Sequence, residues 1–334
     1  MNNIKTIINK IYKMEDLSID ESEYIFNEIM DGNLSDIIIS SFLTALKIKG
    51  ESYNEILAAT KILRKKSKKI NSPENTIDTC GTGGDMSGSL NISTASALVA
   101  ASVGVTIAKH GNRSVSSKSG SADVLENLKI NINMDHKNIE NLLYKKNFCF
   151  MFAQDFHTAM KYVAPVRKEL GTRTIFNLLG PLLNPANAKK QLLGVYDKKW
   201  LITHIKVLKE LGSKHVIAVN GCDGLDEISL SGNSYIVELK DNNIKEYIFN
   251  PKDIGYSLIN NEEIKGGDSK YNADRILKLL NCDNSSFQKI VEINSGATIY
   301  LSGIAKNIKE GCEIAKKSIT EKKAKAYYES LINY

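Results

Sequence analysis

DTCGTGGDMSGSLNIST at Asp78–Thr94 decides the fold, together with the run KHGNRSVSSKSGSADVLE at Lys109–Glu126. Glycine has no Cβ to keep backbone N–H groups from converging on phosphate oxygens, and it permits positive φ. The apolar stretch Ala95–Val103 is expected to be helical, so Asn91–Thr94 lies at a helix start, where free amides and the helix dipole favour an anion. Two such loops flanking a small-residue helix predict a phosphate site; the alternative for the first loop is a tight strand-to-helix turn. The P-loop signature is absent, so nucleoside triphosphate hydrolysis is not indicated.

The length and amino-acid composition limit the classes of protein to which this chain can belong. The chain has 334 residues, enough for one large and one small domain, and its 44 basic and 38 acidic side chains give a net charge of +6. This mild charge suits anionic small molecules and does not require nucleic acid. Five scattered cysteines without CxxC spacing indicate reduced thiols in the cytoplasm, and no apolar run approaches the roughly 20 residues of a membrane span. The N-terminus lacks the features of a signal peptide.

The periodicity divides the chain into two parts. Residues 1–70 read as four amphipathic helices, two of them opened by the capping boxes Ser18/Glu21 and Ser52/Glu55. Four short helices make a thin core, so their apolar faces should pack on the rest of the chain or on a second copy. After a polar linker, residues 71–334 alternate strands with helices and end in helices, which predicts an α/β domain with a central, mostly parallel sheet flanked by helices. The expected strands are Val105–Ala108, Phe148–Ala153, Leu192–Tyr196 and His215–Val219.

Polar residues after these strands are candidates for ligand binding, because ligands bind at the carboxyl ends of parallel strands. Lys109 and Arg113 are cationic partners for phosphate, and the serines that follow add hydroxyl donors. His110 either lines the pocket or is structural. The basic run Lys61–Lys69 has no interleaved aromatic residues and is read as a solvated face of a helix.

Two further positions carry charge suited to a ligand. Arg167, in APVRKELGTRTIFNLLGPLLNP, offers a fork of donors for a carboxylate, or is an ordinary helix-surface arginine. Asp226 and Glu227, in NGCDGLDEISL, are adjacent acids that can ligate Mg²⁺ while waters and phosphate oxygens complete its shell, or are solvated surface acids.

Taken in order, these segments resemble the anthranilate phosphoribosyltransferase family. The motifs are GTGGD, NIST, KHGN with SSKSGSADVLE, PVRKELGTRTIFNLLGPLLNP and GLDE, from Ile77 to Leu230. The resemblance implies the nucleoside phosphorylase-like, class IV phosphoribosyltransferase fold: a small helical domain, which usually forms the dimer, hinged to a large α/β domain. It also implies transfer of the phosphoribosyl group of 5-phosphoribosyl-1-pyrophosphate to the amine of anthranilate in tryptophan biosynthesis, with one or two Mg²⁺ ions. It leaves open an anthranilate synthase partner.

The resemblance also implies roles for individual residues. Those implied to bind the phosphoribosyl donor are Gly81, Gly83, Gly84, Asp85, Ser89, Asn91, Ile92, Ser93, Thr94, Lys109, His110, Gly111, Asn112, Arg113, Ser114, Val115, Ser116, Ser117 and Ser121. Those implied to bind anthranilate are Gly81, His110, Asn112 and Arg167, with Arg167 on the carboxylate. Those implied to bind Mg²⁺ are Ser93, Asp226 and Glu227.

Two other functions remain open at this point. A pyrimidine nucleoside phosphorylase of the same fold would need a different lysine-serine phosphate signature, which is not found. A non-catalytic, nucleic-acid-binding relative would be expected to lose the metal acids or to carry a strongly basic surface, whereas Asp226 and Glu227 are both present. No membrane association is expected.

Overall fold

The computed structural model describes residues 3–113 and 118–334, and the chain divides into two compact units. The helical unit comprises Met1–Lys69 and Gln154–Pro185, and the α/β unit comprises Ile70–Ala153 and Ala186–Tyr334. This division differs from the expected domains, 1–70 and 71–334, because residues 154–185 pack with the helical unit. No helix within the described ranges is long and apolar enough to cross a membrane.

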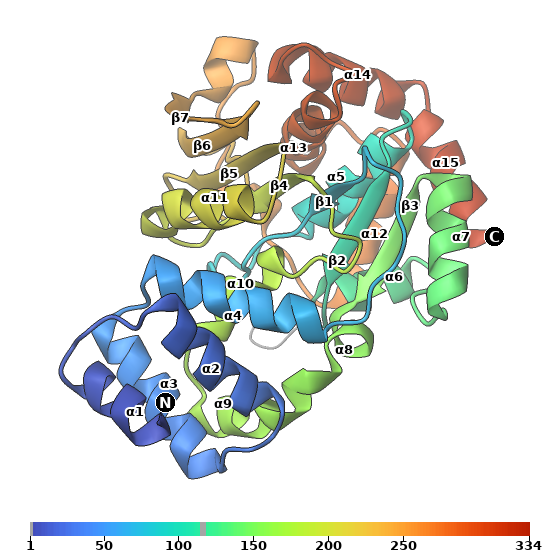
Figure 1. The fold of residues 1–334 in the computed structure, drawn as a ribbon. Helices are drawn as coiled ribbons and strands as arrows, with labels where there is room; N and C mark the ends of the chain where they lie inside the picture. The colour runs from blue at the N-terminus through green and yellow to red at the C-terminus, as the bar shows by residue number, and fades with distance from the viewer. Residues whose placement is uncertain (1–2, 114–117) are drawn as a thin grey trace. The chain divides into compact units, whose positions relative to one another are not determined.

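The helical unit begins with the four helices expected from the sequence (Figure 1): α1 (Ile4–Tyr12), α2 (Ile19–Met30), α3 (Asp36–Lys49) and α4 (Tyr53–Lys66). Both expected capping boxes are formed, so the side chains of Ser18 and Ser52 accept from the third helical N–H and the glutamate there reaches back. Such caps satisfy amides that the helix itself leaves unpaired.

The second segment of this unit completes its core. It contains α8 (Ala153–Phe156), η1 (Thr158–Tyr162), α9 (Ala164–Leu170), α10 (Phe176–Leu179) and η2 (Gly180–Leu182). The ring of Phe176 lies 6.2 Å from that of Phe26 on α2, which also meets Phe42 on α3 at 5.6 Å. Arg64 of α4 donates to the Leu182 carbonyl at 2.6 Å. The apolar faces of the first four helices therefore pack partly on a later stretch of chain, one of the two outcomes expected.

The α/β unit is built on a seven-stranded sheet of order β3-β2-β1-β4-β5-β6-β7 (Figure 1). Five strands run parallel: β1 (Ile77–Thr79), β2 (Ile107–Gly111), β3 (Phe148–Phe152), β4 (Lys190–Gly194) and β5 (His215–Gly221). The strands β6 (Ser234–Lys240) and β7 (Asn243–Phe249) add an antiparallel hairpin that the sequence reading did not predict. Its two-residue turn, Asp241–Asn242, has positive φ at both positions, as tight hairpin turns require.

Helices cover both faces of the sheet. The crossover β1-α5-β2 and the crossover β4-α11-β5 run in opposite directions, so their right-handed geometry puts α5 (Ile92–Ala101) and α11 (Leu201–Glu210) on opposite faces. The α5 side is thickened by α13 (Ser286–Ser302), which packs on α5, β1 and β4. The other helices are α6 (Ser121–Asn127), α7 (His136–Lys146), α12 (Ser269–Leu280), α14 (Ile308–Thr320) and α15 (Lys323–Ile332), with short turns η3 (Lys198–Trp200), η4 (Pro251–Ile254) and η5 (Asn261–Ile264).

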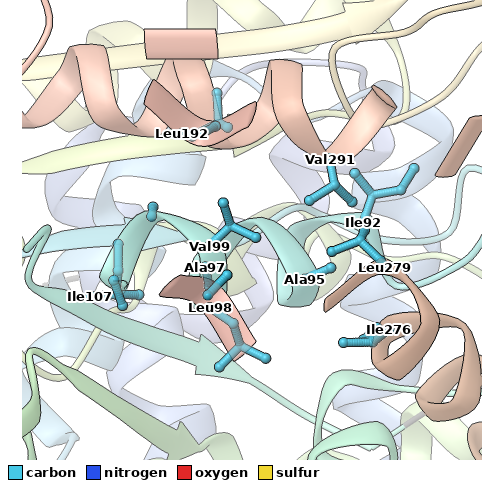
Figure 2. Close-up of a cluster of buried hydrophobic side chains, with 14 of the residues drawn as sticks. Ile92, Ala95, Ala97, Leu98, Val99, Ile107, Leu192, Ile276, Leu279 and Val291 are labelled. Carbon is cyan, nitrogen blue, oxygen red and sulfur yellow. The ribbon is translucent and has the colours of Figure 1, made fainter. Parts of the chain in front are cut away.

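The main core lies between α5 and its neighbours. Figure 2 shows part of it, with Ile92, Leu98 and Val99 on α5, Val291 on α13 and Leu279 on α12. Nine of the ten residues of α5 are buried, so small side chains are needed for the helix to fit between the sheet and α13. This packing fixes the N-terminus of α5 relative to the carboxyl end of β1.

Candidate active site

Both glycine- and serine-rich loops lie at the carboxyl ends of parallel strands, as the sequence predicts. The first follows β1 and leads into α5, and the second follows β2 and leads into α6. The strands β2 and β3 lie on one side of β1 in the sheet, and β4 and β5 lie on the other side. The order in which successive strands are added therefore reverses next to β1. In open α/β sheets this switch point is where ligands bind.

The glycines of the first loop serve two different ends. Gly83 and Gly84 have φ of +63° and +74°, a region that residues with a Cβ rarely adopt. Gly81 has no such φ. Instead, a Cβ at Gly81 would lie 2.7 Å from Asp226 Oδ2, so glycine is needed there for close approach of the loop that carries Asp226 and Glu227, called here the acid loop. The loop therefore has more positions that require glycine than a simple strand-to-helix turn needs.

The start of α5 is prepared for an anion. Asn91 is the N-cap residue, but its side chain makes no capping bond; its Oδ1 accepts from Asn272 Nδ2 at 2.8 Å. This side chain therefore does not cap the 10-residue helix, although the Ile92 N–H donates to the Leu90 carbonyl at 2.7 Å and the Ser93 N–H to the Glu227 side chain. Thr94 is 1% exposed, and its Oγ1 has no hydrogen-bond partner within the described residues. A ligand oxygen beside α5 would supply one.

The second loop begins with two buried side chains on β2. Lys109 is 2% exposed, and its ammonium donates to the Thr79 carbonyl oxygen and, at 3.2 Å, to Ser93 Oγ. His110 is also buried, and its backbone N–H donates to Asp78 Oδ1 at 3.2 Å. The positive charge of Lys109 thus lies between β1 and the first turn of α5. Asp78 was not predicted as part of the site, although it opens the motif DTCGTGG.

Farther along this loop, Arg113 is already paired with acids. Its guanidinium meets Asp123 at 2.9 Å and both oxygens of Glu126 at 2.6 and 2.7 Å. These acids hold the cation on α6, where the sequence reading expected a phosphate partner. Asn112 is exposed, and its carbonyl oxygen accepts from Ser121 Oγ at 3.4 Å. The predicted donor-binding residues Ser114, Val115, Ser116 and Ser117 lie outside the described residues.

The adjacent acids Asp226 and Glu227 reach the same end of the sheet from the loop between β5 and β6, and both are half-buried. Asp226 Oδ2 accepts from the Gly83 N–H at 2.9 Å, and the Asp226 N–H donates to Asp85 Oδ2 at 3.4 Å. Burial, followed by the Asp85 charge, raises the pKa of Asp226. Burial, followed by the Asp226 charge, raises the pKa of Glu227, against the opposing effect of Lys109.

The acids of this loop are hard oxygen ligands that could contribute to binding a divalent cation. Asp226 contacts Gly83 and Asp85 of the first loop, and burial, followed by neighbouring negative charge, raises the pKa values of Asp226 and Glu227. Within residues 3–113 and 118–334, no group of three or more His, Cys, Asp and Glu side chains is placed so that it could hold a metal ion, so these acids could supply only part of an ion's shell. A partial protein shell of hard oxygen ligands is typical of Mg²⁺, which keeps waters and substrate phosphates.

Arg167 belongs to the helical unit, on α9, so the structure groups it with that unit and not with the loops. It is half-buried, its guanidinium lies 5.6 Å from the centroid of the Phe176 ring, and burial lowers its pKa. Within the part of the chain that is described, no carboxylate forms an ion pair with Arg167. A stacked, partly desolvated guanidinium suits a planar anionic ligand.

The remaining predicted residues support the loops. Ser89 forms an isolated bridge with Lys265, Ile92 is buried in the core, and a Cβ at Gly111 would meet the Phe150 ring at 2.7 Å. Sequence reading missed Gly194 at the end of β4, where a Cβ would overlap the backbone carbonyl of Asp226. Only the fold brings this residue to the acid loop.

Comparison with known proteins defines the class. Residues 5–67 match the helical bundle domain of a glycosyl transferase family, and residues 73–325 match its a/b domain. The fold is therefore that of a glycosyl transferase with these two parts.

Individual relatives narrow the class to one activity. Anthranilate phosphoribosyltransferases of Alkaliphilus metalliredigens (strain QYMF) and Shouchella clausii (strain KSM-K16) are each 46% identical, over 93% and 98% of this chain and 92% and 97% of their own lengths. The solved anthranilate phosphoribosyltransferase of Thermus thermophilus has a TM-score of 0.92 at 35% identity, covering 100% of this chain and 99% of that one. The Saccharomyces cerevisiae enzyme, solved with PRPP and Mg, has a TM-score of 0.90 at 27% identity over 99% of this chain and 97% of that one. The chain belongs to the anthranilate phosphoribosyltransferase family.

Proposed function

We propose that this chain transfers the phosphoribosyl group of 5-phosphoribosyl-1-pyrophosphate (PRPP) to the amine of anthranilate, releasing pyrophosphate, as a step of tryptophan biosynthesis. The observation that carries this proposal is the N-terminus of α5, where the partnerless Thr94 hydroxyl and the buried Lys109 ammonium meet at the point where the strand order reverses. The family matches favour this reaction over the phosphorylase and the nucleic-acid-binding alternatives.

The donor's phosphates would lie against the first loop and α5. The hydroxyls of Ser93 and Thr94 and the buried ammonium of Lys109 together offer donors to phosphate oxygens, and the dipole of α5 favours an anion at the same end of the helix. The Gly83 N–H now donates to Asp226, so it becomes available to phosphate only if that carboxylate turns away.

Mg²⁺ would be held by Asp226 and Glu227, with Ser93 as a further oxygen ligand, and one or two ions are implied. When bound, the ion neutralises negative charge on the leaving pyrophosphate. The yeast relative solved with PRPP and Mg supports the use of Mg²⁺. The chain's own part is to present both carboxylates near the first loop, where Gly81 and Gly194 leave room for Asp226.

The chemistry needs charge stabilisation more than a nucleophile. As the C1–O bond breaks, the ribosyl carbon becomes oxocarbenium-like and the pyrophosphate gains negative charge, while the anthranilate amine attacks C1. Donors fixed before the reaction stabilise the leaving group without reorganising. Lys109 is held by Thr79 and Ser93, so its charge is already in place.

Arg167 would bind the carboxylate of anthranilate, with His110, Asn112 and Gly81 contributing to the same substrate. The guanidinium of Arg167 is partly buried and forms no ion pair with a carboxylate among the described residues, which supports this role. A yeast relative has been solved with 4-fluoroanthranilate.

The direct test is the loss of anthranilate fluorescence when the protein, anthranilate, PRPP and Mg²⁺ are mixed, with each component omitted in turn. The proposal expects loss only when all four are present. A folded protein that gives no loss in the complete mixture would contradict it.

The family resemblance also implies a homodimer formed through the helical unit. Ile37 and Ile48 on α3 are 81% and 72% exposed, which supports an apolar interface there. Light scattering would show a mass of two chains, and replacing both isoleucines by glutamate should reduce it to one.

A further inference from the structure

Helix α13 contributes one fully buried polar side chain to the acid loop. Asn294 is 0% exposed, and its amide makes three hydrogen bonds. Its Oδ1 accepts from the Ile228 N–H at 3.0 Å, and its Nδ2 donates to the Ile228 carbonyl at 3.0 Å and to the Ile290 carbonyl at 2.9 Å. Both donors and the acceptor of the amide are therefore used.

Ile228 directly follows Glu227, so this contact fixes the backbone beside the two acids. The Asn294 amide takes both backbone polar groups of Ile228, as a neighbouring strand would. The Ile228 side chain is buried as well, so the residue is held both by packing and by hydrogen bonds. The orientation of the Glu227–Ile228 peptide determines where the Glu227 side chain leaves the chain.

The same helix is also joined to α5. Ser295 Oγ donates to the Ser96 carbonyl at 3.4 Å, and the two helices pack closely along their length. One rigid element therefore positions the anion-binding end of α5 and the loop with Asp226 and Glu227. The separation between phosphate donors and metal ligands depends on this helix.

We propose that Asn294 is a positioning residue for the divalent cation site: by holding the Glu227–Ile228 peptide, it keeps the carboxylates of Asp226 and Glu227 at the distance from α5 that a Mg²⁺–pyrophosphate group needs. The inference rests on the proposed function. Asn294 does not touch substrate or metal; it acts through the Ile228 backbone. An apolar side chain of similar size would fill the space and leave the Ile228 N–H and carbonyl without partners.

The test compares Asn294→Ala and the near-isosteric Asn294→Asp with a control at the far end of the same helix, Ser302→Ala, whose hydroxyl donates to the Ile299 carbonyl of that helix. Isothermal titration calorimetry of PRPP into each full-length protein is repeated over a series of Mg²⁺ concentrations. It gives the Mg²⁺ concentration at which half of the Mg²⁺-dependent increase in PRPP affinity is reached. Circular dichroism establishes that each variant is folded. Asn294→Asp still accepts from the Ile228 N–H but puts a carboxylate against two carbonyl oxygens.

Both Asn294 variants should require roughly 10- to 100-fold more Mg²⁺, as is typical when the support of a metal ligand is lost, whereas Ser302→Ala should match the wild type. A folded Asn294 variant with the wild-type Mg²⁺ requirement would overturn the inference; if Asn294→Ala does not fold, Asn294→Asp decides. If the wild type itself binds no PRPP at any Mg²⁺ concentration, the proposed function fails instead, and the two failures are thereby distinguished.

Discussion

Replacement of Arg167 tests the assignment of the acceptor carboxylate. The guanidinium of Arg167 is half-buried, lies 5.6 Å from the centroid of the Phe176 ring, and has its pKa lowered by burial. Because no carboxylate among the described residues offsets this burial, Arg167→Ala removes a cation that the fold does not need. We expect the free energy of unfolding to change by no more than about 1 kcal/mol, the size of a partly exposed cation–π contact.

The effect on catalysis should be much larger. A charge-assisted hydrogen bond contributes about 1.5–3 kcal/mol, so loss of the fork should lower kcat/KM for anthranilate by roughly 10- to 150-fold. Arg167→Lys retains the charge but loses the planar fork, and we expect it to fall between the wild type and Arg167→Ala.

The assay varies anthranilate at saturating PRPP, then PRPP at saturating anthranilate, and repeats both with aniline, which has the amine but no carboxylate. The wild type should prefer anthranilate strongly, and Arg167→Ala should lose most of that preference while its KM for PRPP stays near the wild-type value. Equal increases in both KM values, or an undiminished preference for anthranilate, would refute the role of Arg167.

Three further changes probe the metal acids, the close backbone contact and the helical unit. Asp226→Asn should raise the Mg²⁺ concentration for half-maximal rate about tenfold or more, while Asp241→Asn in the β6–β7 turn should not; an unchanged Mg²⁺ titration would argue against Asp226 as a ligand. Gly194→Ala places a Cβ where the Asp226 carbonyl lies, so the acid loop must move and kcat should fall by about 100-fold. The control is Gly180→Ala, where a Cβ meets nothing within 4 Å. Equal activities of the two variants would contradict the close contact between Gly194 and Asp226. Burial lowers the pKa of His157 to about 4, below its ordinary value of 6.5, so the unfolded chain binds the proton first and stability is lost as pH falls from 6.5 toward 4. Between pH 7.5 and 5 the loss should be about 2 kcal/mol, measurable by urea unfolding and reduced in His157→Phe; an equal loss in that variant would exclude His157 as the cause.

Local signals in the sequence predict much of the fold. The capping boxes at Ser18 and Ser52 mark two helix starts because their hydrogen bonds form within four residues. The apolar runs that became β3 and β5 were recognisable for the same reason, since their burial is continuous along the strand. The β6–β7 hairpin was missed, although Asp241–Asn242 between alternating side chains is a turn signal.

Contacts between residues far apart in the sequence could not be predicted from local sequence signals. Phe176 packs on Phe26 across about half the chain, so nothing near either residue indicates that residues 154–185 join the helical unit. Likewise, the need for glycine at Gly194 arises from Asp226, and the amide of Asn294 meets Ile228, each through folding alone. Arg113 was expected to face phosphate, but Glu126 on the next helix turned out to pair with it.

The most direct test of the account is the stoichiometry of the complete reaction. With protein, PRPP, anthranilate and Mg²⁺ present, mass spectrometry should detect N-(5-phosphoribosyl)anthranilate, and a coupled assay should find one pyrophosphate released for each anthranilate consumed. Removal of Mg²⁺ with a chelator should stop both. Pyrophosphate release that does not depend on anthranilate, or consumption of anthranilate without the phosphoribosyl product, would contradict the proposed transfer.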